Sequence, residues 1–533
     1  MGERRPNFIL FINDQHRYDY LACNGHPVVR TPNIDAIAAR GVSFDRFYVA
    51  SPVCMPNRAT LMTGRMPSVH GVRFNGTPLS RQAVTFVDLL AGAGYQTALV
   101  GKSHLQCFTG VEPTLKFPPV PEGFHAPSAD LREAIRSPLY GAEYQEEVPG
   151  FWSQENPEMT LPFYGFQHVE LVRGHGDGVG GHYEKWLLSR EPNARALIGE
   201  KNQLPHDYSC PQAVRTALPP ELYHTTYIGE RAEAWLAEHA RADEAPFFLM
   251  VSFPDPHHPF NPPGKYWDMY APDQFPVPEA FIRNDWVPPP HVKGVWDERE
   301  AGAAQLKGMN TISVSAREAQ EAQALTCGMI TMIDDTIGRV LQALEASGQA
   351  NETVLLFTTD HGDHLGDHRL MLKGAEMYQG IVHVPFIWAD PSATEHGTRT
   401  GALATTMDIS ATILDRARVA PYVGLQGQSL LPAISGDPRA GRDAAFIQYD
   451  HQKEAPGLNI PPRVHTLIDG RYRITVFDGV SWGELYDLEA DRGEFQNLWQ
   501  DAAAASTKAR LMEMLLRTEI AHMDTVPMPT NRA

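Results

Sequence analysis

One stretch of the chain brings together a thiol, a guanidinium and the start of a helix. Residues 51–64 read Ser-Pro-Val-Cys-Met-Pro-Asn-Arg-Ala-Thr-Leu-Met-Thr-Gly. Pro56 suits the first position of a short helix and Gly64 suits its end, so Cys54 comes immediately before the helix and Arg58 lies one turn beyond Cys54. A group at Cys54 would meet the positive end of the helix dipole beside a guanidinium that keeps its charge, which favours an anion. The simpler alternative for Cys54 is a buried structural thiol.

Four apolar segments elsewhere in the chain each end in an unusual polar pair. The pairs are Asp14-Gln15, Lys102 with His104, His257-His258 and Asp360-His361. In an open parallel sheet, ligands bind beyond the carboxyl ends of the strands, so pairs that follow different strands should converge. Taken singly, each pair has a local explanation, such as a turn cap at Asp14 or a structural loop histidine at His257. The recurrence of the pattern favours one shared site.

The segment from Asp360 to His368 also contains a spacing that could suit zinc. His364 and His368 are four residues apart, which would place both imidazoles on one face of a helix. Gly362 and Gly366 oppose a helix there, so we do not expect a zinc site.

The elements that must position these residues alternate between strands and helices. Continuous apolar runs predict buried strands, and apolar residues at three- and four-residue spacing predict amphipathic helices. The expected strands are at about 6–13, 42–48, 95–100, 246–253, 353–359 and 384–389. The expected helices are at about 31–41, 56–64, 85–90, 226–239, 317–344 and 408–417. This alternation predicts an α/β fold with a large, mostly parallel sheet sandwiched by helices.

Two parts of the chain depart from that alternation. Residues 108–243 are rich in Pro, Gly and acidic residues, and we interpret them as an insertion that either borders a pocket or forms surface turns. Beyond about residue 425, short strands separated by turns predict a smaller antiparallel sheet, followed by a helix at about 502–522. We therefore expect a catalytic domain at 1–425 and a C-terminal antiparallel-sheet subdomain with its tail at 426–533.

The composition disfavours several classes of protein. Hydrophobic residues make up 43% of the 533 residues and charged residues 20%, which is typical of a folded globular chain. The formal net charge of −19 disfavours nucleic acid and anionic membranes as partners. Five cysteines, at positions 23, 54, 107, 210 and 327, show no paired spacing and argue against a disulfide framework. The early apolar run Phe8 to Ile12 is too short for a signal peptide or a membrane span, so we expect a cytoplasmic protein.

The motif Cys54-x-Pro56-x-Arg58, followed by Ala-Thr-Leu-Met-Thr-Gly, resembles the signature of the type I sulfatases of the alkaline phosphatase superfamily. Other family-like segments cover nearly the whole chain. They include Asn-Phe-Ile-Leu-Phe-Ile-Asn-Asp-Gln, Gly-Lys-Ser-His, Pro-His-His-Pro-Phe, Phe-Thr-Thr-Asp-His-Gly-Asp and Glu-Leu-Tyr-Asp-Leu. The resemblance implies that a formylglycine-generating enzyme oxidises Cys54 to formylglycine, and that a hydroxyl of the hydrated aldehyde is the nucleophile.

The same resemblance implies one divalent metal. The matching positions are Asp14, Gln15, Asp360 and His361, with the modified residue 54 completing the shell. Carboxylate and amide oxygens suit Ca²⁺, and the imidazole makes Mn²⁺ a reasonable alternative. The Asp-Gln and Asp-His pairs depart from arylsulfatases that carry two adjacent aspartates, and they resemble the phosphonate monoester hydrolases, a sister group.

The resemblance also implies roles for the polar residues around residue 54. The positions that match groups holding the sulfate oxygens are Arg58, Lys102 and Lys373, and Asn75 matches a substrate-facing amide. His257 matches the proposed general acid, which protonates the departing alkoxide or phenolate and leaves a covalent sulfate ester on residue 54. His104 matches the base that deprotonates the remaining hydroxyl of the hydrate, so that sulfate leaves and the aldehyde returns.

We therefore predict a promiscuous sulfate monoester hydrolase similar to arylsulfatases. Lys102 and His104 favour this over the alternative, a phosphonate monoester or phosphate diester hydrolase that uses the same site. An alternative of another class is a non-catalytic relative that binds anions. The small anionic ester itself stays open among aryl sulfates, alkyl sulfates, sulfated sugars and choline sulfate. A homo-oligomer is also compatible with the sequence, because the tail 522–533 could reach a neighbouring subunit.

Overall fold

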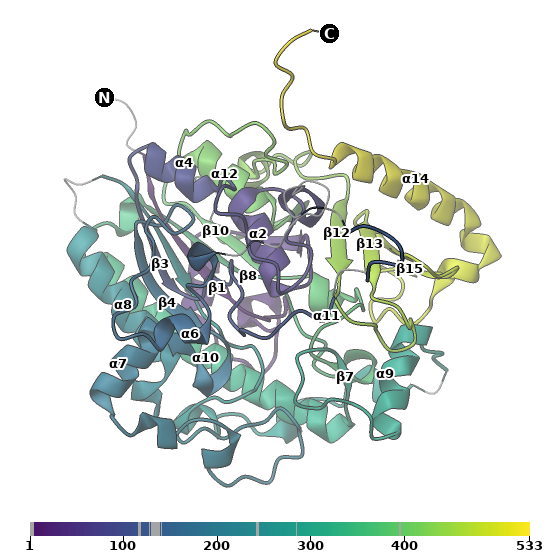
Figure 1. The fold of residues 1–533 in the computed structure, drawn as a ribbon, viewed down its shortest axis with the longest axis horizontal. Helices are drawn as coiled ribbons and strands as arrows, with labels where there is room; N and C mark the ends of the chain where they lie inside the picture. Colours follow the sequence, from purple (N-terminus) through teal and green to yellow (C-terminus); the bar gives the residue numbers. More distant parts are fainter. Residues whose placement is uncertain are drawn as a thin grey trace.

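The apolar run that begins at Asn7 forms β1 (Asn7–Asn13), the middle strand of a nine-stranded sheet. The computed structural model describes residues 5–115, 119–126, 128, 139, 141–240, 245–283, 285–393 and 396–532. Across the large sheet the strand order is β11-β2-β10-β8-β1-β6-β3-β4-β5; Figure 1 labels β10, β8, β1, β3 and β4 of this sheet. The other strands are β2 (Val42–Tyr48), β3 (Gln96–Gly101), β4 (His168–Arg173), β5 (Gly180–Gly181), β6 (Phe247–Ser252), β8 (Thr353–Thr359), β10 (Phe386–Ala389) and β11 (Thr398–Thr405).

Five neighbouring strands of this sheet, β8, β1, β6, β3 and β4, run parallel. Their register places Ile12 beside Ser252 and Thr358, and Val100 beside Val251. β10 and β5 run antiparallel to their neighbours, so the sheet is mixed but mostly parallel. The carboxyl ends of the five central strands consequently meet at one edge.

Two layers of helices cover the sheet because β1 alternates its apolar side chains between both faces. Phe8, Leu10 and Ile12 pack with residues of α2 (Cys54–Thr63), α4 (Phe86–Gly92) and α12 (Asp408–Arg416). Ile9 and Phe11 pack on the other face with α1 (Pro32–Ala39), α7 (His182–Arg190), α8 (His224–His239) and α10 (Ala316–Ala346). The α/β sandwich predicted from the sequence is confirmed.

A second sheet lies in the C-terminal part of the chain. It contains β12 (Ala445–Asp450), β13 (Arg463–Ile468), β14 (Tyr472–Phe477) and β15 (Gly483–Asp487), all antiparallel. The final helix α14 (Ala505–Ala521) packs along it, and the tail then leaves the body of the molecule (Figure 1). Further elements among the described residues include a two-stranded sheet of β7 (Ile312–Ser313) and β9 (Leu370–Met371), several short 3-10 helices, and the helices α3 (Pro67–His70), α6 (Pro149–Trp152), α9 (Pro290–Glu300), α11 (Gln379–Val382) and α13 (Leu431–Ile434).

The structure corrects the interpretation of residues 108–243 as an insertion. β4 lies within this region and pairs in parallel with β3, with Ala98 opposite His168, so part of the region belongs to the central sheet. β4 lies near the sheet edge and is only half-buried, so it lacks the continuous apolar run of a central strand. Residues 116–118, 127, 129–138, 140 and 241–243 of the region lie outside the described residues.

The strand β11 was not expected from the sequence. It pairs in parallel with β2 at the opposite edge of the large sheet, and its first residues alternate between half-buried and exposed. Within the described ranges, no helix combines the length and the apolar character needed to span a membrane.

The tight pairing of β3 with β6 gives a test of this architecture. Gly101 ends β3 with φ at 113°, and a Cβ atom there would lie 1.8 Å from the carbonyl oxygen of Ser252. We expect Gly101→Ala to push β3 away from β6 and to destabilise the protein by about 2 kcal/mol or more. The measurement is the thermal midpoint.

The matched control is Gly92→Ala, at the end of α4, where an added Cβ atom meets nothing within 4 Å. This variant should keep or raise the midpoint, because alanine favours a helix. Equal midpoints for the two variants would contradict the described strand packing.

Candidate active site

Cys54 lies at the start of helix α2, where the chain enters the carboxyl edge of the sheet. The sequence placed Cys54 just before the helix, whereas the helix begins at Cys54 itself. Val53 is extended, with φ −136° and ψ 140°, and its carbonyl accepts the first helical bond, from the Asn57 amide at 3.0 Å. Pro56 therefore falls within the first turn, where its missing N–H needs no partner. The predicted stop is confirmed, since Gly64 follows α2 in the left-handed conformation.

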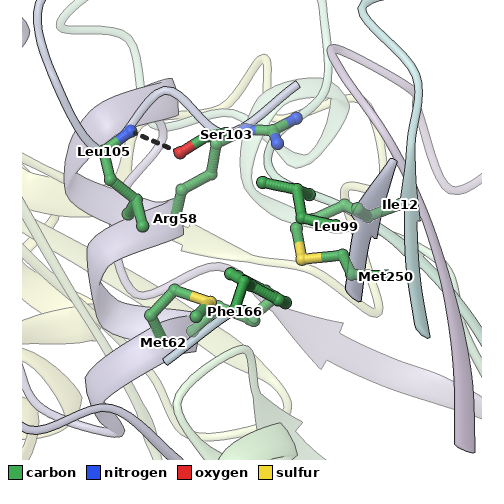
Figure 2. Close-up of a pocket in the computed structure, with 9 residues that line it drawn as sticks. Ile12, Arg58, Met62, Leu99, Ser103, Leu105, Phe166 and Met250 are labelled. Atoms are coloured by element: carbon green, nitrogen blue, oxygen red, sulfur yellow. Dashed lines mark hydrogen bonds between the residues drawn. The ribbon is translucent and has the colours of Figure 1, made fainter. Parts of the chain in front are cut away.

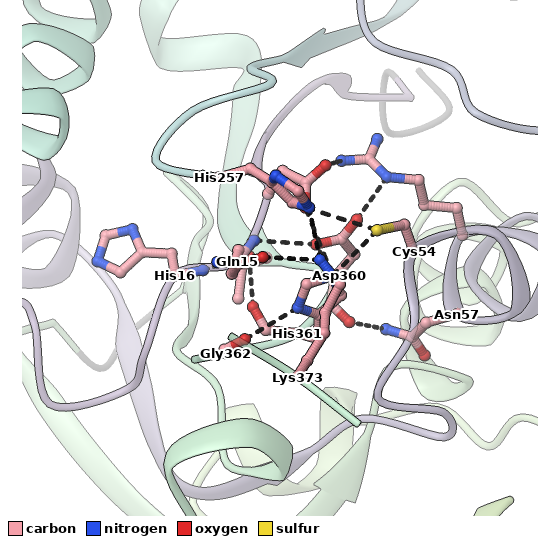
Figure 3. A network of polar contacts seen from close by, with 12 residues as sticks. Gln15, His16, Cys54, Asn57, His257, Asp360, His361, Gly362 and Lys373 are labelled. Atoms are coloured by element: carbon pink, nitrogen blue, oxygen red, sulfur yellow. Dashed lines mark hydrogen bonds and ion pairs between the residues drawn. The ribbon is translucent and has the colours of Figure 1, made fainter. Parts of the chain in front are cut away.

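The ends of five parallel strands bring polar side chains to this helix. Asp14 follows β1, Lys102 follows β3, His175 follows β4, His257 follows β6 and Asp360 follows β8. All of these except the half-buried His175 are buried. Residues that are up to 346 positions apart in sequence thus form one polar network (Figure 3).

Four of the predicted metal-shell residues form a compact cluster. One potential ligand atom each from Asp14, Cys54, Asp360 and His361 lies within 4.8 Å of the others. His361 Nδ1 lies 2.9 Å from the carbonyl oxygen of Gly362 and donates to it, so His361 Nε2 keeps its lone pair and faces Cys54 Sγ at 3.1 Å. Two carboxylates, one imidazole and residue 54 fit a divalent cation.

Gln15, the fifth predicted ligand, is held by contacts of its own. Its amide nitrogen donates to Asp363 Oδ2, and its side-chain oxygen accepts from Lys373 Nζ at 2.7 Å. Its backbone N–H donates to Asp360 Oδ1 at 3.3 Å. Gln15 therefore lies beside the cluster and connects it to Lys373, and its role as a ligand stays a prediction.

Arg58 joins α2 to the strand ends. Its Nε donates to Asp360 Oδ2 at 2.6 Å, and its Nη1 donates to Ser252 Oγ at 2.9 Å and to the Lys102 carbonyl at 3.1 Å. Nη2 lies 3.9 Å from Asp14 Oδ2 and has no hydrogen-bond partner among the described residues. Burial alone would lower the pKa of Arg58, but Asp360 and Asp14 raise it above its usual value.

Charge balance also sets the protonation of Asp14 and Cys54. Burial alone would raise the pKa of Asp14, but Lys102, which contacts it directly, and His257 hold this pKa well below its usual range. Burial and the neighbouring Asp14 carboxylate raise the pKa of the Cys54 thiol to about 12. The encoded thiol is therefore protonated at neutral pH, 3.8 Å from Asp14 Oδ1.

His257 contacts the third cation of the site. Its Nδ1 donates to the His258 carbonyl at 2.6 Å, so its Nε2 accepts from Lys373 Nζ at 2.5 Å. Burial and the neighbouring His175 hold the pKa of His257 well below its usual range, so the ring is neutral without substrate.

The sequence did not single out His175 as a site residue. Its ring stacks on His257 with centroids 3.5 Å apart, and its Nε2 lies 2.6 Å from Lys102 Nζ and 3.4 Å from Asp14 Oδ2. Burial and Lys102 lower its pKa to about 3, so His175 accepts the hydrogen bond from Lys102. A sequence signal for His175 was its position two residues after the strand β4, but the sequence did not predict that strand.

Glu147 fixes the loop that carries His104. Its carboxylate accepts from the backbone N–H groups of His104, Leu105 and Gln106 at 3.0, 3.1 and 3.0 Å. Burial raises the pKa of Glu147 to about 7, although these donors favour its ionised form. His104 is buried with Nδ1 unpartnered among the described residues, and burial and Lys102 hold its pKa well below the usual value.

Asn75 and the histidines His364 and His368 lie outside the carboxylate cluster. Asn75 is exposed, and its side-chain oxygen accepts from the amide of Met55 at 3.1 Å, next to residue 54. His364 lies 3.7 Å from Glu376, and His368 packs on Tyr378 with centroids 3.7 Å apart. Neither histidine belongs to a potential metal cluster among the described residues.

A small apolar cavity lies behind the Arg58 side chain. It is lined by Ile12, Leu99, Met250 and other side chains of the core (Figure 2). Its volume of about 10 Å³ is at the lower limit for one water molecule. It is therefore a packing void beneath the site, not a place for a substrate.

Comparison with known proteins agrees with this geometry. The family model described as "Sulfatase" matches residues 6–419, and the model described as "N-sulphoglucosamine sulphohydrolase, C-terminal" matches residues 366–521. An arylsulfatase of Clostridium perfringens is 27% identical over 504 residues, which cover 93% of this chain and 90% of that protein.

One further relative and one solved structure are also similar to this chain. The multifunctional alkaline phosphatase superfamily protein PehA of Trinickia caryophylli is 26% identical over 546 residues, with 98% of this chain and 96% of that protein covered. The crystal structure of the phosphonate monoester hydrolase of Agrobacterium radiobacter matches with a TM-score of 0.74 and 27% identity, covering 98% of this chain and 96% of that one.

The carboxylate cluster predicts metal binding that can be measured without a substrate. We expect chelator-treated protein to bind one equivalent of Ca²⁺ or Mn²⁺ by isothermal titration calorimetry. Asp360→Asn should weaken this binding by at least about tenfold, because it removes a charged ligand. Glu376→Gln, which alters a buried carboxylate outside the cluster, should leave it unchanged. Equal binding by wild type and Asp360→Asn would contradict the assignment.

Proposed function

The chain belongs to the sulfatase family, and on that premise we propose that it hydrolyses sulfate monoesters at the site around residue 54. The observation that carries the proposal is the cluster of Asp14, Cys54, Asp360 and His361 at the start of α2, with Arg58 bonded to Asp360. A site of this kind combines a place for a divalent cation with a fixed guanidinium beside the nucleophile position.

Three cations are available to bind the sulfate group. Arg58 has its Nη2 free of hydrogen-bond partners among the described residues, and Lys102 and Lys373 are held by neutral imidazoles and by acidic or amide groups. We assign these three side chains to the sulfate oxygens, with the exposed Asn75 on the substrate side. Positive charge fixed in a buried site stabilises the charge that concentrates on these oxygens in the transition state.

The chemistry requires a nucleophile that the encoded thiol does not supply. We propose that residue 54 is converted to formylglycine by a formylglycine-generating enzyme. The hydrate of this residue would supply the attacking hydroxyl. Asp14, Gln15, Asp360, His361 and residue 54 would hold a divalent cation, Ca²⁺ or alternatively Mn²⁺, which when bound would lower the pKa of that hydroxyl.

Two histidines are assigned to proton transfer. His257 presents Nε2 toward Lys373, and a proton on this atom would pass to the ester oxygen as the S–O bond breaks. His104 would take a proton from the remaining hydroxyl of residue 54 as sulfate leaves, and the Glu147 carboxylate keeps its loop in place. Both rings are neutral in the free site, so an anionic substrate must favour protonation of His257.

Phosphonate monoester or phosphate diester hydrolysis is the second candidate. The observations that favour it are the Asp14-Gln15 and Asp360-His361 pairs and the similarity to the phosphonate monoester hydrolase structure. The same cations and nucleophile position suit a phosphonate oxygen, so cross-activity is expected.

The modification of residue 54 is the direct test of this mechanism. In protein from the native host, the tryptic peptide that contains residue 54 should have the mass of formylglycine in place of cysteine. Cys54→Ala should lower kcat for 4-nitrophenyl sulfate at least about 10³-fold, because the covalent route is lost. Cys107→Ala, at a half-buried cysteine outside the cluster, is the matched control and should keep full activity. An unmodified Cys54 in fully active enzyme would refute the mechanism.

A further inference from the structure

Phe108 lies beside the site and has no role in the mechanism above. It follows the loop that carries Lys102 and His104, and it is half-buried, whereas both of those residues are buried. Its ring centroid lies 4.1 Å from that of His104 at an interplanar angle of 34°, and 5.2 Å from that of His175 at 76°. Phe108 therefore contacts two site histidines while the residue as a whole remains partly accessible.

Phe108 completes a continuous row of rings. His175 stacks on His257 at 3.5 Å and 9°, and His257 stacks on His258 at 4.1 Å and 23°. We call Phe108, His104, His175, His257 and His258 the ring wall. Its members come from the loops after β3, β4 and β6, so three strand ends fix its position.

The ring wall borders the cations that would hold sulfate. Lys102 Nζ lies 2.6 Å from His175 Nε2 and 5.7 Å from the Phe108 ring centroid. Lys373 Nζ contacts His257 in the same wall. An ester whose sulfate group lies between these lysines would have its remaining part pass along the wall. Of the five wall residues, Phe108 and His175 are half-buried and the other three are buried, and the His175 side chain itself is only 7% exposed, so Phe108 is the wall residue more open to an incoming ester.

The chemistry of the wall selects among leaving groups. A flat uncharged ring can stack on Phe108 or meet its edge, which stabilises the complex beyond the burial of apolar area alone. A cationic leaving group would also suit an aromatic face, but Lys102 already lies near that ring, and two cations on one ring repel each other. A short alkyl group offers little surface to stack.

We propose that Phe108 is a specificity-determining residue, and that the ring wall makes sulfate esters of aromatic alcohols the preferred substrate class. This inference rests on the proposed sulfatase function and adds the leaving group that the sequence left open. Phe108 acts on substrate binding, because a stacking contact holds the leaving group before and during the reaction.

The test compares kcat/KM for the same substrate between wild type and each variant. This comparison removes the intrinsic difference in reactivity between leaving groups. The substrates are phenyl sulfate, butyl sulfate and choline sulfate, and the enzyme has formylglycine confirmed at residue 54. Phe108→Ala should lower kcat/KM for phenyl sulfate by about fivefold to tenfold, mainly through KM. The same variant should change kcat/KM for butyl sulfate and for choline sulfate by less than about twofold. Phe108→Trp, which keeps an aromatic face, should retain most of the activity on phenyl sulfate.

The control is Phe124→Ala, which removes a 72% exposed phenylalanine outside the ring wall and should affect no substrate. If Phe108→Ala lowered kcat/KM equally for all three esters, or lowered it most for choline sulfate, the inference would be overturned. These outcomes leave the proposed function standing, because wild type is active. Wild type that hydrolyses none of these three sulfates but hydrolyses a sulfated sugar would overturn this inference alone, whereas wild type that hydrolyses no sulfate ester would overturn the proposed function as well.

Discussion

Two buried carboxylates lie at the centre of the site, and each of them is paired with a buried cation. Asp360 pairs with Arg58 at 2.6 Å, Asp14 contacts Lys102, and none of these four side chains is more than 1% exposed. An ion taken out of water costs several kcal/mol unless it is paired, and removal of one partner of a buried pair typically costs about 3–5 kcal/mol. Helix α2 and the ends of β1, β3 and β8 are therefore held together by charge as well as by packing.

The same paired groups suit the site to bind both an anion, beside the basic side chains, and a cation, at the carboxylates. Asp14 and Asp360 carry two negative charges, and Arg58, Lys102 and Lys373 carry three positive ones, so the site favours an anion although the chain has a formal net charge of −19. A divalent cation at the carboxylate cluster would increase this local excess. The positive charges arranged at the site thus outweigh the repulsion that the net negative charge of the whole chain exerts on an anion.

The sequence predicted the parts of the site that depend on strong local signals. Apolar runs identified the central strands, and the polar residues directly after them, such as Asp14 and Asp360, lie together because parallel strands share an edge. His175 and Glu147 could not be found in this way. His175 follows a half-buried strand near the sheet edge, and Glu147 acts on a distant backbone segment that no spacing in the sequence connects to it. The start of α2 at Cys54 was missed because the proline preference for a first helical position pointed two residues later.

We propose that this charge arrangement serves sulfate esters. The most direct measurement compares kcat/KM for an aryl sulfate and the matching aryl phosphonate monoester, on protein with formylglycine confirmed at residue 54. We expect a clear preference for the sulfate, because Lys102 and His104 complete the site. A clear preference for the phosphonate would contradict it, and the Asp-Gln and Asp-His pairs would then be the better guide to the reaction.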